Sequence, residues 1–488
     1  ACSSLGLIFS SCSPDFGYEA AKARFGQIEP KLLFAAHSYY YGGKHFDTLS
    51  TVRQLADSIP GIEKVVLFPY PDLSVDVPEG RFVRWEDWLG EDEGLEFASL
   101  PFDYPLYILF SSGTTGLPKA IVHRAGGALL KHHSELHLHS DIKAGDRMLY
   151  FTTCGWMMWN WLVSGLSQGA TIVQFEGSPA YPDLASLWKL SEKQKLSFFG
   201  TSARYLHSLQ AQGFSAKDAA DLGTLKTIAS TGSPLSPSGF DYVYSHIKAD
   251  VHLASISGGT DIVGCFMLGV PTKAVYSGQI QGPAMGVELV ALNEAGQSVR
   301  NEPGELVIQN PLPSMPLYFW NDPDFERYKQ AYLEDYPGKW RHGDLIELTE
   351  QGGIIVYGRS DATLNPGGVR IGTAELYRPL EVISEIIEAC AIGKKTGQDE
   401  EIWLFVVLQE GHTLDEDLEK QIRAEIRSKA SPRHVPKRIV QISQLPRTRS
   451  GKSMEIAVSR LMNGLTVPNR EVMANPEALD ELKQLIAK

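Results

Sequence analysis

Between residues 107 and 257, short apolar runs alternate regularly with stretches of helical spacing. The runs that predict buried strands lie at 107–110, 148–152, 171–175, 197–201, 224–230 and 251–257. Strands that alternate with helices are joined by right-handed crossovers and form mostly parallel sheets covered by helices on both faces. In such sheets, ligands bind beyond the carboxyl ends of the strands. We therefore expect an α/β fold, with its chemistry in the loops that follow these strands.

The flanking regions have different patterns. Residues 1–100 contain strand-like runs at 31–35 and 64–68, with helical spacing between them at 47–59. From about residue 287 the apolar period changes to two residues, with turn residues between the runs. This pattern is typical of antiparallel hairpins. The sequence therefore predicts a β-rich part after the central α/β region.

A smaller mixed unit is expected near the C-terminus. Its predicted helices and strands lie near 373–389, 402–408, 414–430, 438–442, 454–462 and 475–486. The expected fold class is α/β, with a large N-terminal body of mostly parallel sheets covered by helices plus a β-rich subdomain. We assign residues 1–360 to this body. Residues 361–488 are expected to form a small, mobile α+β C-terminal domain.

Length and composition restrict the class of protein. A chain of 488 residues is too long for one hydrophobic core, so two or three domains are expected. The net charge of −13, without an extended basic run, argues against nucleic-acid binding. The five cysteines form no CxxC pair, which favours a reducing compartment over a disulfide framework or a zinc site. Since neither a basic leader nor a long apolar stretch is present, we expect a cytoplasmic protein without membrane insertion.

The first loop of the central region is rich in hydroxyls and glycines. It contains Ser111, Ser112, Gly113, Thr114, Thr115, Gly116 and Lys119. Its backbone amides, hydroxyls and ammonium would form a cradle for a polyphosphate, although a plain polar turn is the alternative. The spacing from Gly113 to Lys119 does not fit a Walker P-loop. The Walker-like end at 447–453 is also excluded, because Pro446 stands where the first glycine belongs.

Two later loops also follow predicted strands. The small residues of Ser230–Leu235 would let a flat ring lie against the backbone, although an ordinary strand-to-helix turn explains them equally well. The loop Ser257–Asp261 offers the hydroxyl of Thr260 to a phosphate and the carboxylate of Asp261 to a hard cation such as Mg²⁺. Taken alone, such a turn is more often structural.

Three charged residues are candidates for substrate contacts. Asp344 could bind the two hydroxyls of a ribose, and Arg359 could contact ribose or phosphate. Structural salt bridges are the alternative for both. Lys452 follows a Ser-Gly turn, from which a long cationic side chain could reach another domain, and a solvated basic turn is its alternative.

Histidines and aromatic residues gather after the first loop. The histidines at 123, 132, 133, 137 and 139 lack an HExxH pattern, and we interpret them as surface and packing residues. The run that includes Trp156, Met157 and Met158 is typical of a core. It could also form the wall of an apolar substrate pocket at the end of a strand.

Together and in order, these segments resemble the core motifs of the acyl-adenylate-forming superfamily. That superfamily contains acyl-CoA synthetases, luciferases and the adenylation domains of peptide synthetases. The segments that carry the resemblance are 111–119, 230–234, 257–261, 342–344, 358–361 and 446–452. They extend over essentially the whole chain, and their combination is highly specific. Segments 10–17, 155–161 and 257–262 more closely resemble the acyl-CoA synthetases that act on acetoacetate.

The resemblance implies a two-step ligation that uses ATP, CoA and Mg²⁺. A carboxylate attacks the α-phosphate of ATP to give acyl-AMP and pyrophosphate, and the CoA thiolate then displaces AMP. Because the first step brings two anions together, neutralisation of charge and positioning are most of the catalysis. The implied partners are therefore small molecules: acetoacetate, ATP and CoA.

The same resemblance assigns roles to individual residues. Catalytic roles fall to Lys452, Thr260 and Asp261, with Asp261 supporting Mg²⁺. The implied ATP-binding residues are Ser111, Ser112, Gly113, Thr114, Thr115, Gly116, Lys119, Gly232, Ser233, Pro234, Ser257, Gly258, Gly259, Thr260, Asp344, Arg359, Arg370 and Lys452. The implied acyl pocket consists of Trp156, Met157, Met158, Thr231 and Gly258. CoA would meet Gly367, Gly368, Arg370 and Arg427.

Lys452 is the lysine that the resemblance implies for adenylation. After adenylation, the C-terminal domain is expected to rotate about Asp361, which withdraws Lys452 and presents Gly367 and Gly368 to the pantetheine tunnel. Substitution of Lys452 by alanine should then abolish acyl-AMP formation but spare thioester formation from supplied acyl-AMP. Acetylation of this lysine would remove its charge, so an acetyltransferase or a deacetylase is a possible partner.

The expected acid is acetoacetate, and other short acids such as propionate, butyrate or hydroxybutyrate are the alternative. Acetate-specific relatives carry a tryptophan at the position of Gly258, and its absence would leave room for a four-carbon keto acid. On this argument Gly258→Trp would shift the preference toward acetate. Synthetases of this type begin well upstream of the position of Ala1, so an N-terminally incomplete chain is expected. An inactive nucleotide-binding fragment is therefore a further alternative.

Overall fold

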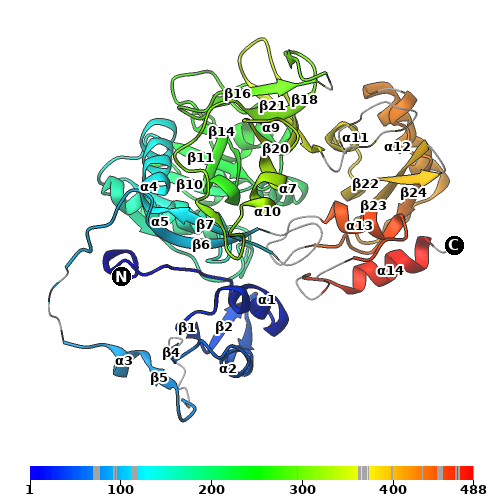
Figure 1. Cartoon of the computed structure of the whole chain (residues 1–488). Coiled ribbons are helices and arrows are strands. Elements are labelled where there is room, and N and C mark those ends of the chain that lie inside the picture. Colours follow the sequence, from blue (N-terminus) through cyan, green and yellow to red (C-terminus); the bar gives the residue numbers. More distant parts are fainter. Residues whose placement is uncertain are drawn as a thin grey trace.

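The structure is a computed structural model of the whole chain (Figure 1). It describes residues 1–488 except 70–76, 92, 93, 95, 112–117, 294, 361–363, 365, 367–370, 372, 397, 398, 431, 448–453, 468, 469, 471, 472, 487 and 488. Several residues with predicted roles fall in these gaps. The bounds given below for helices and strands refer to the described residues.

A five-stranded parallel sheet lies at the centre of the large body. Its order is β12-β11-β10-β8-β9, formed by His252–Ser255, Thr227–Thr231, Phe198–Ser202, Arg147–Tyr150 and Thr171–Val173. Neighbouring residues of each strand enter different cores. Met148 and Phe198 pack in one core, while Leu149 and Phe199 pack in the other. Since both faces are buried, these strands are continuous apolar runs, as parallel strands between helices should be. The predicted α/β class is confirmed.

Helices cover both faces of this sheet. One core contains residues of α4 (Ala125–Ser134) and α5 (Met157–Val163). The other contains residues of α6 (Ser186–Gln194), α7 (Ala203–Ala211), α8 (Ala216–Ala219) and α9 (Pro237–Tyr242). Short helical turns continue α4, α5 and α9 at Glu135–His139, Ser164–Gln168 and Val243–Ile247. These helices leave the carboxyl ends of the strands accessible.

The first predicted strand is present, but the element that follows its loop was missed. β6 (Pro105–Ser111) pairs antiparallel with β7 (Lys119–Arg124), so residues 111–119 connect a hairpin. β19 (Tyr318–Phe319) extends this sheet on the other side of β7. Both β7 and Lys119 therefore have positions fixed by a sheet that the local pattern did not reveal.

The β-rich part begins directly after the parallel sheet. β13 (Ser257–Gly259), the turn η5 (Thr260–Ile262) and β14 (Gly264–Leu268) form a tight hairpin, to which β15 (Gly282–Pro283) adds a third strand. A five-stranded antiparallel sheet follows, in the order β17-β16-β18-β20-β21. Its strands are Ser298–Val299, Leu289–Leu292, Gly304–Ile308, Trp340–Leu348 and Ile354–Arg359, and α10 (Glu326–Tyr332) precedes β20. The predicted change from parallel to antiparallel sheets is confirmed.

Within the first hundred residues, several elements form a small unit with its own core, while Phe9 packs against the core of the large body. A parallel sheet of order β1-β4-β5 consists of Leu32–Ala36, Lys64–Phe68 and Phe82–Arg84. Leu33 and Val65 pack with Phe25 of α1 (Tyr18–Ile28) and Leu55 of α2 (Leu49–Ser58). The remaining elements are η1 (Ser3–Leu5), the hairpin of β2 (Ser38–Tyr41) and β3 (Lys44–Asp47), and α3 (Trp85–Trp88). In Figure 1 this unit lies below the large body.

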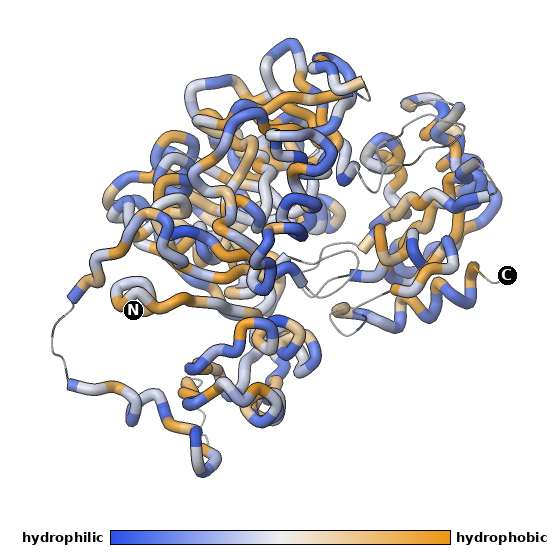
Figure 2. Tube along the Cα trace, in the orientation of Figure 1, coloured by the Kyte–Doolittle hydropathy of each residue, from blue (hydrophilic) through white to orange (hydrophobic). Residues whose placement is uncertain are grey.

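The C-terminal part is a separate group of elements (Figure 1). β22 (Ile386–Thr396), β23 (Asp399–Leu408) and β24 (Arg438–Gln441) form its sheet. Its helices are α11 (Thr373–Leu380), α12 (Glu416–Lys429), α13 (Glu455–Met462) and α14 (Glu477–Ile486), with the turn η8 at Pro432–His434. Apolar and polar residues alternate along α14 (Figure 2), whose Leu479 and Leu482 are buried.

One predicted helix of this part is wrong in its second half. Helical spacing predicted a helix from 373 to 389, but α11 ends at Leu380 and β22 begins at Ile386. β22 pairs with β23 along nearly its whole length, from Ile386 opposite Leu408 to Thr396 opposite Asp399. Long-range pairing thus overrides the local pattern. Among the described helices, none is long and apolar enough to cross a membrane.

Candidate active site

A cavity of about 600 Å³ opens at the carboxyl ends of the parallel strands. The loops after β8, β11 and β12 all reach it, through Thr153, Gly232 and Ile256. Because parallel strands end at the same edge, loops that are far apart in sequence meet here. The structure therefore has a cavity at the predicted location of the site.

Most described residues with a predicted role line this cavity. They are Ser111, Lys119, Trp156, Met157, Met158, Thr231, Gly232, Ser233, Pro234, Ser257, Gly258, Gly259, Thr260, Asp261, Asp344 and Arg359. Arg427 does not, since it is exposed on α12. The structure therefore brings together residues of six separate segments of the sequence.

Other residues with predicted roles lie outside the described part of the chain. They are Ser112, Gly113, Thr114, Thr115, Gly116, Asp361, Gly367, Gly368, Arg370 and Lys452. Their roles as phosphate ligands, hinge, CoA contacts and adenylation lysine stay predictions. The flanks of the Lys452 segment are described: Pro446 accepts a hydrogen bond from the amide of Met454, and Met454 lines the cavity.

The carboxylate of Asp261 is held by two side chains of the site. Its Oδ1 lies 3.2 Å from the ammonium of Lys119 and accepts a hydrogen bond from the phenol of Tyr332. Burial acts to raise the pKa of the Asp261 carboxyl, but Lys119, His342 and the Tyr332 hydroxyl outweigh it and hold the pKa below its ordinary value. Asp261 is therefore a carboxylate at any physiological pH.

Tyr332 was not predicted from the sequence. It closes α10 and lines the cavity, and its ring stacks on Trp340 with centroids 3.6 Å apart. Burial, followed by the charge of Asp261, raises the pKa of its phenol well above the ordinary value, so the hydroxyl stays a donor. No motif surrounds Tyr332 in the sequence, and its contact with Asp261 arises from tertiary packing alone.

Two buried histidines flank the Thr260–Asp261 turn. His342 lines the cavity, and burial lowers the pKa of its imidazole. His123 of β7 is only 1% exposed, and burial lowers its pKa to about 3. Both rings are therefore neutral near pH 7. Neither was a predicted site residue, although His342 stands two positions before Asp344 in a segment that the sequence had singled out.

Asp344 and Arg359 face one another across β20 and β21. They are register partners, and Nη1 of Arg359 lies 3.3 Å from Oδ1 of Asp344. The same nitrogen donates to the carbonyl of His342 at 3.0 Å. The salt bridge considered as the alternative for each residue thus exists between the two, at the edge of the cavity. This arrangement does not conflict with a polyol contact, since Arg359 remains about half exposed.

The turn after β11 presents backbone to the cavity. Gly232 has a φ of +90°, a conformation that suits glycine, and Ser233 and Pro234 follow it. Ser236 then caps α9, its hydroxyl accepting the amide hydrogen of Gly239 at 3.1 Å. The turn is thus held between a parallel strand and a capped helix, and it can offer a flat surface to a ring.

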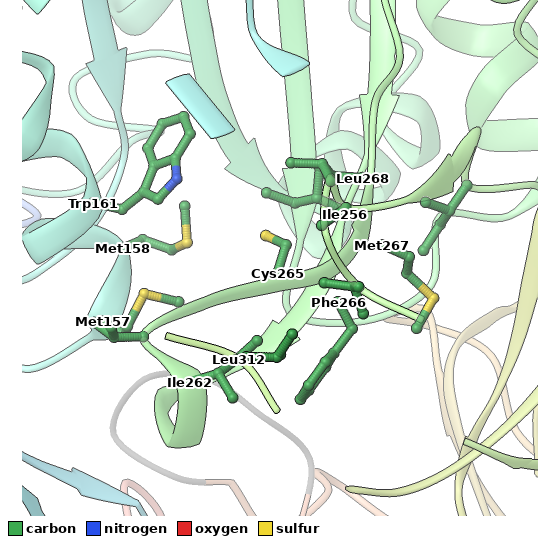
Figure 3. Close-up of a cluster of buried hydrophobic side chains, with 14 of the residues drawn as sticks. Met157, Met158, Trp161, Ile256, Ile262, Cys265, Phe266, Met267, Leu268 and Leu312 are labelled. Carbon is green, nitrogen blue, oxygen red and sulfur yellow. The ribbon is translucent and has the colours of Figure 1, made fainter. Parts of the chain in front are cut away.

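The inner end of the cavity is apolar. Met157, Met158 and Cys265 point toward one another there, beside Trp161 and Ile256 (Figure 3). A buried ion pair of Lys131 and Glu135, with 3.1 Å between charged atoms, lies behind this wall. The carboxylate of Glu135 also accepts the Cys265 amide at 2.7 Å and the Trp161 indole N–H at 2.9 Å. This polar support of an apolar wall was not predicted.

A side chain does not fit at Gly258 without a shift of the backbone. A Cβ on Gly258 would lie 2.0 Å from the carbonyl oxygen of Gly264 and 2.4 Å from Cα of Cys265, because β13 and β14 are paired at this point. The expectation that Gly258→Trp would simply fill the acyl pocket is therefore wrong. Gly258 lines the cavity with its backbone, and the pairing of the two strands requires glycine there.

Further lining residues come from both ends of the chain. Ser13, Asp15, Phe16 and Arg24 enter from the N-terminal unit, with the Arg24 guanidinium 4.6 Å from the centroid of the Phe16 ring. Residues of α13 enter from the C-terminal part. The segment 10–17 had been noted for its resemblance to known synthetases, and that signal could have placed Ser13 and Asp15 at the site.

Comparison with known proteins gives a consistent result. Residues 1–319 match the family model of AMP-binding enzymes, and residues 381–452 match that of the AMP-binding enzyme C-terminal domain. Acetoacetyl-coenzyme A synthetase of Rhizobium meliloti (strain 1021) is 50% identical over 484 residues, covering 98% of this chain and 74% of that protein. Acetoacetyl-CoA synthetase of Mus musculus is 43% identical over 492 residues, covering 98% of this chain and 73% of that protein.

Solved structures agree with this result. An acetoacetyl-CoA synthetase from Streptomyces lividans superposes with a TM-score of 0.93 and 40% identity, covering all of this chain and 75% of that one. An anthranilate CoA ligase in complex with anthranoyl-AMP shares the fold at 18% identity, with a TM-score of 0.77. This chain spans about three quarters of the length of its relatives.

Proposed function

This chain belongs to the family of AMP-binding enzymes, and from that premise we propose that it is an acetoacetyl-CoA synthetase. It would join acetoacetate to CoA through acetoacetyl-AMP, releasing AMP and pyrophosphate. The observation that carries the proposal is a single cavity where Lys119, Thr260, Asp261, Asp344 and Arg359 converge beside an apolar inner end. The relatives named above, which carry that activity in their names, support the choice of acid.

In the first step, a carboxylate oxygen of the acid attacks the α-phosphorus of ATP. The bond from that phosphorus to the bridging oxygen of pyrophosphate breaks, and the leaving group takes the electron pair. The attack joins two anions, so cations in the cavity lower its barrier. Lys119 and Arg359 line the cavity as ion-pair partners of Asp261 and Asp344, and each can turn to a phosphate oxygen.

The residues present are suited to Mg²⁺ bound together with ATP. Mg²⁺ is usually held by one or two carboxylates plus substrate phosphates. Asp261 supplies one fixed carboxylate in the cavity wall, and Thr260 supplies a hydroxyl beside it. When bound, the metal would neutralise phosphate charge. Asp261 is the residue that would hold it.

The nucleoside would lie against the turn after β11 and the pair on β20 and β21. Gly232, Ser233 and Pro234 would carry the adenine, because their backbone forms an open surface at the cavity. Asp344 would accept hydrogen bonds from the ribose hydroxyls, while Arg359 holds that carboxylate in place. Trp156, Met157 and Met158 would enclose the acyl chain.

In the second step, the CoA thiol loses its proton, and its sulfur attacks the carbonyl carbon of acetoacetyl-AMP. The carbon–oxygen bond to AMP then breaks. We assign Gly367, Gly368, Arg370 and Arg427 to CoA, and Asp361 to the hinge of a domain boundary between 360 and 361, on the strength of the resemblance. Lys452 is assigned to adenylation, so acetylation of its side chain would act on the first step only.

Lys452→Ala tests this division of labour. Loss of the ammonium should reduce acetoacetate-dependent exchange of pyrophosphate into ATP by more than a hundredfold, because removing one transition-state charge contact typically costs about 10²–10³ in rate. Thioester formation from supplied acetoacetyl-AMP should change by less than about threefold. Equal loss of both half-reactions would contradict the assignment.

A panel of acids tests the proposed function itself. Pyrophosphate release is measured with acetoacetate, acetate, propionate, butyrate and 3-hydroxybutyrate, each with and without CoA. Release with acetoacetate alone supports the proposal. Release with several acids would indicate a short-chain acyl-CoA synthetase of broader specificity, and no release with any acid would indicate a nucleotide-binding fragment.

A further inference from the structure

We propose that Tyr332 is a positioning residue for Asp261 and that Lys119 is an exchangeable counterion of the same carboxylate. When Mg²⁺ binds, the ammonium of Lys119 moves from Asp261 to the nucleotide phosphates. The inference rests on the proposed function, because it takes Asp261 as the carboxylate that holds Mg²⁺. It adds two roles that the motifs did not indicate. One side chain keeps the carboxylate in place, and another occupies the position of the metal's charge until the nucleotide arrives.

Tyr332 is a hydrogen-bond donor that is held rigidly by its neighbours. The residue is 3% exposed at the end of α10, and its hydroxyl donates to Oδ1 of Asp261. Its ring stacks on Trp340 at an interplanar angle of 13°. Phe319 and Tyr328 meet it edge to face, with centroids 5.7 and 5.2 Å away. Enclosed on several sides by aromatic rings, the phenol has little freedom to release the carboxylate.

Lys119 holds the same oxygen in a different way. Its ammonium lies 3.2 Å from Oδ1 of Asp261, and 5.1 Å and 5.6 Å from the ring centroids of Tyr332 and Phe319. The side chain is 27% exposed, in contrast to the buried tyrosine. Lys119 is the first residue of β7 and the last residue of the predicted phosphate-binding loop. A flexible lysine in this position can swing toward a phosphate without disturbing the sheet.

Charge decides which donor leaves. A divalent cation and an ammonium on the same carboxylate would repel strongly in a partly buried site. A neutral phenol carries no such penalty and continues to orient the carboxylate. The β- and γ-phosphates offer Lys119 a new anionic partner at the moment when Mg²⁺ takes its former place. Asp261 is thus never left as an unpaired buried charge, which would be costly.

Equilibrium binding of ATP, with excess Mg²⁺ and with EDTA, tests the role of Tyr332. Tyr332→Phe keeps the stacked ring and removes the hydroxyl. We expect it to reduce the Mg²⁺-dependent gain in ATP affinity about tenfold, as for loss of a hydrogen bond to a charged group, while affinity in EDTA changes less than about twofold. Tyr205→Phe is the matched control, since it also removes one buried phenol hydroxyl but lies on α7 outside the cavity lining, and it should behave as wild type.

The counterion role is tested with Mg²⁺ alone, by calorimetric titration without nucleotide. Lys119→Met should bind Mg²⁺ more tightly than wild type, because the competing ammonium is gone, and should bind ATP in EDTA more weakly. Weaker binding of Mg²⁺ by Lys119→Met would overturn the exchange. An unchanged Mg²⁺-dependent gain in Tyr332→Phe, or an equal loss of affinity in EDTA, would overturn the positioning role.

These binding measurements separate the inference from the choice of acid. They use no acid substrate, so they can succeed even where the acid panel selects a substrate other than acetoacetate. Failure of wild-type protein to bind ATP at all would instead remove the proposed function and the inference together. The two outcomes are distinct.

Discussion

Single residues decide more of this site than their local sequence reveals. The resemblance placed Gly258 at the acyl pocket, and the residue does line the cavity. What the sequence could not reveal was the strand on the other side, because the carbonyl of Gly264 lies across the β13–β14 pair. Tyr332 is the opposite case: no motif marks it, yet it holds the central carboxylate. Motifs locate residues along the chain, and packing decides what each of them touches.

The tight fit at Gly258 predicts a large effect from one methyl group. Gly258→Ala places a Cβ 2.0 Å from a backbone oxygen, so we expect a loss of at least about 2 kcal/mol in the free energy of unfolding. Gly26→Ala is the control, because that helical glycine has only Lys22 Cγ near, at 3.9 Å. The control should be neutral or stabilising by up to about 1 kcal/mol. Urea titration measures both, and a tolerated Gly258→Ala would refute the strand pairing described here.

At the scale of elements, the prediction succeeded where structure is local and failed where pairing is distant. The strands at 198–202 and 227–231 were foreseen because their apolar runs are bounded by turns. Since such strands are parallel, their following loops could be placed at one edge. β7 and β22 were missed, because each is stabilised by a partner strand, β6 and β23 respectively, that local periodicity does not identify.

The capped helix after the adenine turn provides a test at this scale. Ser236→Ala removes the cap of α9 and should destabilise the protein by about 1 kcal/mol. Because the turn Gly232–Pro234 ends at this cap, we expect the KM for ATP to rise several-fold with little change in kcat. Asp415→Ala is the control, since it removes the equivalent cap of α12, whose hydrogen bond to Leu418 is 2.9 Å. An equal rise in KM for both variants would assign the effect to general stability.

At the scale of the whole molecule, three parts of the chain share one cavity. Contacts between the large body and the C-terminal part include Arg204 with Glu388 at 3.5 Å and the Ser238 hydroxyl with Glu381 at 3.0 Å. The arrangement of these parts could not be read from periodicity, which describes each segment alone. The motif order nevertheless predicted that distant segments would meet. The boundary at 360 and 361 stays a prediction.

Buried histidines connect the stability of the whole fold with pH. Burial lowers the pKa of His123 to about 3 and that of His207 to about 4. In the unfolded chain these imidazoles would have a pKa near 6.5. Below that pH the unfolded chain therefore binds protons that the folded chain does not bind. Their contribution to stability is therefore complete above pH 6.5 and falls as the pH drops toward the folded values. Stability should decrease by about 1.4 kcal/mol per pH unit for each such histidine.

His123→Gln isolates one of these protons. The buried amide of the new glutamine will lower stability at every pH. The quantity to compare is therefore the slope of the free energy of unfolding against pH. Between pH 6.5 and 5 the free energy of unfolding of the variant should fall by about 2 kcal/mol less than that of wild type, because the variant takes up one proton fewer on unfolding. His137→Gln, a substitution of an exposed histidine, should keep the wild-type slope. Urea titrations at several pH values measure both, and an unchanged slope in His123→Gln would mean that this ring takes up its proton over the same pH range in the folded and the unfolded protein, which its 1% exposure beside the Thr260–Asp261 turn argues against.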